Sequence, residues 1–192
     1  MEIPLEFFSN PDEAFRNIKS KPDARKAAFW ALGAWVSACL GALQLPGIHL
    51  SPLAFAVILS ASGLMLLPSI YLKSLLLHSI TRISGGTGDR NALFAMFAFC
   101  LMPFYLLLPL SIILRNSVLL MPPVFIGIVS WAAVLGIKAI KENYSYTIIQ
   151  AVCLGLAPAI ILLIFLLIFF FAAAAMLALK LILTLLKFSA LL

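Results

Sequence analysis

The feature that most constrains this chain is a series of long apolar runs, each separated from the next by a short polar or turn-forming stretch. The first run, residues 27–45, has 19 residues. As a helix rising about 1.5 Å per residue it would be about 28 Å long, which matches the hydrocarbon core of a bilayer. Four further runs of at least this length follow, at residues 53–80, 91–114, 118–137 and from 146 onward. Each predicts a membrane-spanning helix.

Charge is too scarce for a soluble domain of this size. Of the 192 residues, 64% are hydrophobic and 10% are charged, whereas soluble domains carry about a quarter charged residues. Most of the surface must therefore face lipid or other membrane-embedded protein. The composition excludes a soluble enzyme, a disordered tail and a nucleic-acid binder, and the basic residues form no patch with interleaved aromatics. We expect an all-α membrane protein, a five-span transmembrane helix bundle.

The segment before the first run carries half of the charge. Residues 1–26 hold five acidic and five basic residues. Asn10 is a predicted helix cap, with Pro11 in the first turn and Glu13 three residues after the cap. We expect a short amphipathic helix at the membrane surface, which Pro22 ends. The predicted organisation is a cytoplasmic N-terminal segment, 1–26, followed by a membrane domain.

Polar stretches mark the ends of the runs. We expect a loop at residues 81–90, a turn at 115–116 and a short polar loop at 138–144. Pro68 is expected to kink the second run. Residues 27–171 would form the five-span domain.

The last run is too long for one span. From Tyr146 to Leu192 it has 47 residues, about 70 Å as a helix, and no turn signal that would reverse the chain. Lys180, Thr184 and Lys187 share one helix face. Residues 172–192 are therefore interpreted as an amphipathic extension of the fifth span, bent onto the surface or snorkelling its lysines, rather than as a sixth span.

The distribution of Lys and Arg predicts the orientation. Ten of the 13 basic residues fall in or beside the N-terminal segment and the loops at 81–90 and 138–144, and three fall on the opposite side. Because cytoplasmic loops retain positive charge, the N-terminus is expected inside and the C-terminus outside.

Several short stretches carry a family resemblance. Residues 8–15 contain an asparagine-proline pair followed by Phe15, and residues 78–88 are a helix end followed by Gly-Gly-x-Gly. Pro103 follows, and Trp131 and Gly136 stand in the fourth run. In these features the chain resembles the Yip domain (Ypt-interacting protein) family, prokaryotic type.

The resemblance implies five spans, a cytoplasmic N-terminus and a prokaryotic cytoplasmic (inner) membrane. Eukaryotic Yip proteins are tied to vesicle trafficking and Rab-type GTPases. The N-terminal segment here is short, so Rab binding is not carried over.

The loop after the second run is the candidate site for a cytoplasmic partner or an anionic lipid headgroup. In the simpler interpretation, Gly85 ends the helix in a left-handed conformation, and the basic residues are ordinary positive-inside anchors. In the alternative interpretation, backbone N–H groups of the loop and a loosely aligned basic stripe of Lys73, His78 and Arg82 bind phosphate. The candidate residues are Lys73, His78, Arg82, Gly85, Gly86, Gly88 and Arg90.

Small residues recur every four positions in the first run, at Gly33, Ser37 and Gly41. Such faces let helices approach closely in lipid. Packing within the bundle is the favoured interpretation, and homodimerisation through this face is the alternative.

No catalytic, metal or cofactor site is predicted. All seven acidic residues lie outside the spans, which argues against an ion-coupled transporter. His49 and His78 stand at opposite ends of the second run, so they are not expected to share a metal site within one protomer. Cys39, Cys100 and Cys153 each sit alone in an apolar run and are expected to be buried free thiols.

These features favour a non-enzymatic membrane scaffold or adaptor for membrane organisation or trafficking-like processes. Its partners would be the lipid bilayer, with its anionic headgroups, and a membrane protein or a second copy. The alternative is a small transporter, channel or lipid-handling protein, in which prolines break helices around a cavity. The prolines in question are Pro68, Pro103, Pro109 and Pro158.

Overall fold

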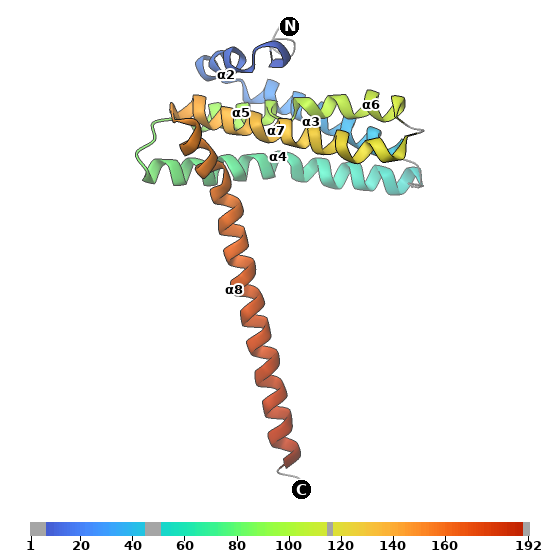
Figure 1. Cartoon of the computed structure of the whole chain (residues 1–192), viewed down its shortest axis with the longest axis vertical. Coiled ribbons are helices and arrows are strands. Elements are labelled where there is room, and N and C mark those ends of the chain that lie inside the picture. The colour runs from blue at the N-terminus through green and yellow to red at the C-terminus, as the bar shows by residue number, and fades with distance from the viewer. Residues whose placement is uncertain (1–6, 45–50, 115–116, 190–192) are drawn as a thin grey trace. The chain divides into compact units, whose positions relative to one another are not determined.

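The computed structural model describes residues 7–44, 51–114 and 117–189, which form helices and no strand. It divides into two compact units, Met1–Gly155 and Leu156–Leu192. In the first unit the long helices run side by side, and a short helix, α2, lies at one edge of them (Figure 1). The long C-terminal helix, α8, begins in the first unit and makes up the described part of the second.

The N-terminal helix α2, Pro11–Ser20, begins as predicted. The Asn10 side chain accepts a hydrogen bond from the backbone N–H of Glu13, and Pro11 occupies the first turn. Proline has no backbone N–H, and an N–H in the first turn has no partner within the helix. Pro11 therefore costs this helix no hydrogen bond. The predicted break near Pro22 is also confirmed, and α3, Ala24–Leu43, starts at the cap Asp23.

Helix α4, Pro52–Ile83, is longer than the run that predicted it. The Ser51 hydroxyl caps its start by accepting from the N–H of Ala54. The helix passes through Pro68 and stays helical to Ile83. It ends at Ser84 and Gly85, directly after its last apolar residue.

The third run is not one helix. It consists of α5, Arg90–Phe99, a 3-10 segment η1, Met102–Leu106, and α6, Leu107–Ile113. Pro103 explains the interruption, because a proline within a helix lacks the N–H and clashes with the carbonyl four residues before it.

Helix α7, Met121–Tyr144, follows a short 3-10 turn, η2, Val118–Leu120. The prediction of a polar loop at 138–144 is wrong, because those residues form the last turns of α7. They contain no glycine or proline, and the helix ends only at Ser145, which adopts a left-handed conformation with φ 55°. The last helix, α8, Ile148–Ser189, runs on through Pro158 without reversing.

Within the described residues, four segments are long and apolar enough to cross a membrane: Ala24–Leu43, Pro52–Ile83, Arg90–Ile113 and Met121–Tyr144. The core of the first unit centres on α5, which packs against α3, α4 and α7. Every residue from Ala92 to Cys100 except Phe94 is buried. The α5 segment is thus an internal helix of the bundle.

Candidate functional site

Helix α2 is attached to the bundle through its apolar face. Ala14, Phe15 and Ile18 are buried against α5 and α7. The Phe7 ring packs edge-on against Phe15 at 5.1 Å and lies 6.1 Å from the ring of Phe99 in α5. The face that the sequence assigned to the membrane surface therefore contacts protein.

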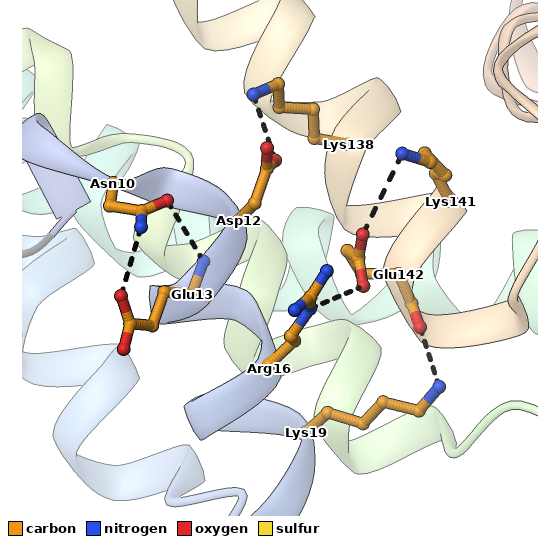
Figure 2. A network of polar contacts seen from close by, with 8 residues as sticks. All are labelled: Asn10, Asp12, Glu13, Arg16, Lys19, Lys138, Lys141 and Glu142. Atoms are coloured by element: carbon orange, nitrogen blue, oxygen red, sulfur yellow. Dashed lines mark hydrogen bonds and ion pairs between the residues drawn. The ribbon is translucent and has the colours of Figure 1, made fainter.

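The polar face of α2 is paired with the C-terminal turns of α7 (Figure 2). The Lys138 ammonium lies 2.9 Å from a carboxylate oxygen of Asp12. The Arg16 guanidinium lies 3.7 Å from the carboxylate of Glu142. Lys19 donates a hydrogen bond of 2.6 Å to the backbone carbonyl of Glu142. These contacts set the register of α2 on α7.

The apolar contacts hold α2 more strongly than the ion pairs do. The Arg16 side chain is 72% exposed, and ion pairs of this kind contribute about 0–1 kcal/mol. Burying one large apolar side chain contributes about 1.5–3 kcal/mol, and Phe15 is fully buried. The charges therefore select the docking position, and Phe15 supplies most of the stabilisation.

The loop after α4 begins with the glycine conformation that the sequence predicted. Gly85 has φ +82°, in the left-handed region. The N–H of Gly86 then donates to the carbonyl of Thr81 over 2.8 Å, and the N–H of Gly85 donates to that of Arg82. This is a glycine-dependent helix ending, with the last carbonyls satisfied by the loop.

The next two glycines make room for two tyrosines. A Cβ at Gly88 would lie 2.5 Å from Cε1 of Tyr144, and a Cβ at Gly86 would lie 2.5 Å from the hydroxyl of Tyr146. The rings of Tyr144 and Tyr146 stack with their centroids 5.7 Å apart. Gly86 and Gly88 are therefore needed for close packing of the loop on the end of α7.

Polar contacts tie the same loop to α7 and α4. The Asn143 amide donates to the carbonyl of Asp89 over 3.0 Å. The Tyr144 hydroxyl lies 2.9 Å from Nδ1 of His78. The Asp89 carboxylate accepts from the N–H of Ala92 and so caps α5. The loop is held on both sides and starts α5 in a defined place.

An open cavity of about 1000 Å³ lies between the last turns of α4 and this loop. It brings together five of the seven predicted residues, His78, Arg82, Gly86, Gly88 and Arg90. The remaining lining residues are Leu75, Ser79, Ile83, Thr87, Asp89 and Asn91.

Lys73 does not belong with this group. Its ammonium lies 4.7 Å from the centre of the Phe97 ring in α5, and it does not line the cavity around His78 and Arg82. A step of five residues along a helix turns the side chain by about 140° from His78. Lys73 therefore lies apart from the cavity that His78 and Arg82 line.

The sequence matches a known protein family over most of its length. Residues 5–170 match the Yip1 domain. The chain belongs to the Yip1 domain family. No curated protein and no solved structure matches it. With its four long apolar helical segments among the described residues, this is an integral membrane protein of the Yip family, and the resemblance seen in the sequence is confirmed.

In this Yip1-domain chain, the small-residue face of α3 is filled by the third segment. A Cβ at Gly33 would lie 3.0 Å from Cζ of Tyr105 and closer still to its hydroxyl, and one at Gly41 would lie 3.0 Å from the backbone of Leu107. Ser37 donates to the Tyr105 carbonyl over 3.0 Å. These contacts support packing within the bundle, since a second copy would have to displace η1 and α6.

The prediction of buried free thiols is confirmed at Cys100 and is wrong in the degree of burial at the other two cysteines. Cys100 is buried, Cys39 is half-buried and Cys153 is exposed. All three are free. In the described part of the chain, no group of three or more His, Cys, Asp or Glu residues is arranged to hold a metal ion.

Sequence reasoning placed residues 138–144 on the cytoplasmic surface, but as a loop and without singling out any of their side chains. Asn143, Tyr144 and Tyr146 contact the glycine loop, and Glu142 contacts α2. The available signal was a cluster of polar and aromatic residues directly after an apolar run. Assigning residues 138–144 to a loop concealed that these side chains project from a fixed helix.

Proposed function

We propose that this protein is a non-enzymatic membrane scaffold or adaptor that binds its partners on one polar surface. We define this polar surface as α2, residues 84–89 and residues 138–146. The observation that carries the proposal is the docking of α2 on α7. Phe15 is buried there, Asp12 pairs with Lys138, and Arg16 pairs with Glu142. A surface assembled from three separate segments in a fixed register can recognise a partner at little cost in conformational entropy.

The packing of the third segment favours this function over transport. In transporters, interrupted helices line a substrate cavity. Here side chains fill the space beside the interruption at Pro103. Tyr105 donates to the Trp30 carbonyl over 3.0 Å, and Ser37 donates to the Tyr105 carbonyl. The Trp30 and Tyr105 rings also pack edge to face, with centroids 6.0 Å apart.

The proposed topology follows from the charge distribution. The polar surface would lie on the cytoplasmic side of a prokaryotic inner membrane, because ten of the 13 lysines and arginines lie in or beside the segments that form it. Helix α8 would be the fifth span, with the C-terminus outside and residues 172–192 as its amphipathic extension.

The proposal is tested by affinity purification of the full chain from its native membranes, followed by protein and lipid mass spectrometry. We expect the wild-type chain to recover a protein in stoichiometric amount. The Lys138→Asp variant should recover much less, because it reverses a charge on the polar surface itself and places two carboxylates against each other at the contact between α2 and α7. The exchanged pair, Lys138→Asp with Asp12→Lys, should restore recovery by re-forming the ion pair in the opposite sense.

Arg25→Gln is the matched control, because Arg25 is exposed at the start of α3. It should leave recovery of the protein unchanged. The scaffold proposal would be wrong if wild-type chain recovered only lipids. It would equally be wrong if the same protein were recovered from the wild-type chain and from Lys138→Asp, since the polar surface would then not be the binding surface.

A further inference from the structure

The cavity beside the glycine loop has the chemistry of an anion site. One of its walls is a single face of α4, because Leu75, His78, Ser79 and Arg82 follow one another at helical spacing. The opposite wall is the loop and the first turn of α5, with Thr87 and Arg90. Two arginines, one imidazole and hydroxyl groups thus border one open space.

The two arginines are available to a ligand. Among the described residues, the ion pairs involve α2 and α7 and include neither Arg82 nor Arg90. Arg82 is exposed, and Arg90 is oriented by a cation–π contact in which its guanidinium lies 5.5 Å from the centre of the Tyr71 ring. The guanidinium fork matches phosphate oxygens in geometry as well as in charge.

The acidic residue in the lining does not neutralise this wall. The Asp89 carboxylate accepts a 2.8 Å hydrogen bond from the N–H of Ala92 at the start of α5. The positive end of the helix dipole stabilises its charge there. Arg82 and Arg90 together therefore leave the cavity with a cationic excess.

The apolar surface next to the cavity indicates an amphiphilic ligand. Leu75 lies in the lining, and Tyr71, Leu72 and Leu76 are exposed on the preceding turns of α4. Because α4 is long and apolar enough to span a membrane, we expect this surface to border the acyl region. A phosphate at the arginines would leave acyl chains along it.

We propose that this cavity binds the phosphate group of an anionic phospholipid, with Arg82 and Arg90 as the principal ligands and the exposed apolar turns of α4 beside its acyl chains. His78 is held by the Tyr144 hydroxyl and borders the same space. The cavity shares residues 86–89 with the polar surface, but its two principal ligands, Arg82 and Arg90, lie outside that surface, so the two proposals can fail separately.

The test measures lipid retention by native mass spectrometry on the full chain in detergent, titrated with phosphatidylglycerol or phosphatidylcholine. We expect the wild-type chain to retain phosphatidylglycerol preferentially. Arg82→Gln combined with Arg90→Gln should weaken that binding by about tenfold or more, because two charge-assisted contacts are lost. Each single variant should show an intermediate loss.

Arg25→Gln is again the control: it removes one charge outside the cavity, as each single variant removes one inside it, and should change binding by less than about twofold. Unchanged binding in the double variant would overturn the proposal. So would an equal loss in Arg25→Gln, because the attraction would then be general to the basic side of the protein. Thermal unfolding in detergent checks that all variants remain folded.

A competition arm separates a lipid from a soluble phosphate compound. Excess inorganic phosphate should displace phosphatidylglycerol only weakly, because it lacks the apolar contacts beside Leu75. Complete displacement by inorganic phosphate would assign the cavity to a free phosphate and overturn the lipid proposal.

Discussion

Gly88 in the loop after α4 lies so close to Tyr144 at the end of α7 that a Cβ at position 88 would be 2.5 Å from the ring carbon Cε1 and 2.7 Å from the amide nitrogen of Asn143. Neither Tyr144 nor Asn143 can move away without losing other contacts. The Tyr144 ring stacks on Tyr146 and its hydroxyl contacts His78, while the Asn143 amide donates to the Asp89 carbonyl. Because Gly88 has no side chain, the loop after α4 can pack directly against the end of α7, although the two segments are far apart in sequence.

Replacing Gly88 by alanine should therefore destabilise the protein by about 1–3 kcal/mol, as overpacking of a rigid site does. The measurement is chemical or thermal unfolding in detergent. Gly127→Ala in α7 is the matched control, because a Cβ there has no neighbour within 4 Å. It should be neutral or stabilising by about 0.5–1 kcal/mol, the helix preference for alanine. Equal effects of the two substitutions would contradict this interpretation.

Gly33→Ala should destabilise the contact between α3 and the third segment by a similar amount, about 1–3 kcal/mol. The clash is with the Tyr105 hydroxyl, the atom nearest to the added Cβ. Tyr105→Phe removes that oxygen, and with it the bond to the Trp30 carbonyl. In a double-mutant cycle the Gly33→Ala cost should therefore be smaller when it is combined with Tyr105→Phe. Strict additivity would show that the hydroxyl is not the obstacle.

Phe15→Ala should release α2, whereas Glu142→Gln should not. Truncating a buried phenylalanine costs about 3–5 kcal/mol, but losing an ion pair whose arginine is 72% exposed costs about 1 kcal/mol or less. Hydrogen exchange of the α2 amides measures both, and only Phe15→Ala should accelerate it strongly. Phe29→Ala is the matched control, since Phe29 is 70% exposed. Faster exchange in Glu142→Gln than in Phe15→Ala would reverse the assignment.

The orientation can be measured with single cysteines in a chain from which Cys39, Cys100 and Cys153 have been removed. Ser84→Cys should react with a membrane-impermeant maleimide only from the cytoplasmic side. Ser117→Cys, beyond the third segment, should react only from the opposite side, because one span separates the two positions. Labelling of both from the same side would show that the predicted topology is wrong.

Local signals in the sequence predicted the helix boundaries that depend on near neighbours. The Asn10 cap bonds to a residue three positions away, and Gly85 ends α4 by its own left-handed conformation. The end of α7 had no such local signal. Residues 138–144 are polar because they contact α2 and the glycine loop, and polarity alone was mistaken for a loop.

The sequence by itself determined that this chain is a helical membrane protein of the Yip family, because run length, scarcity of charge and short motifs are properties of the chain. Only the tertiary structure decided which residues act together. Arg16 meets Glu142, Tyr105 fills the space at Gly33, and Lys73 lies over Phe97 while Arg82 lines the cavity with Arg90. These pairs join segments distant in sequence, and their geometry depends on how whole helices pack and in which direction each side chain projects.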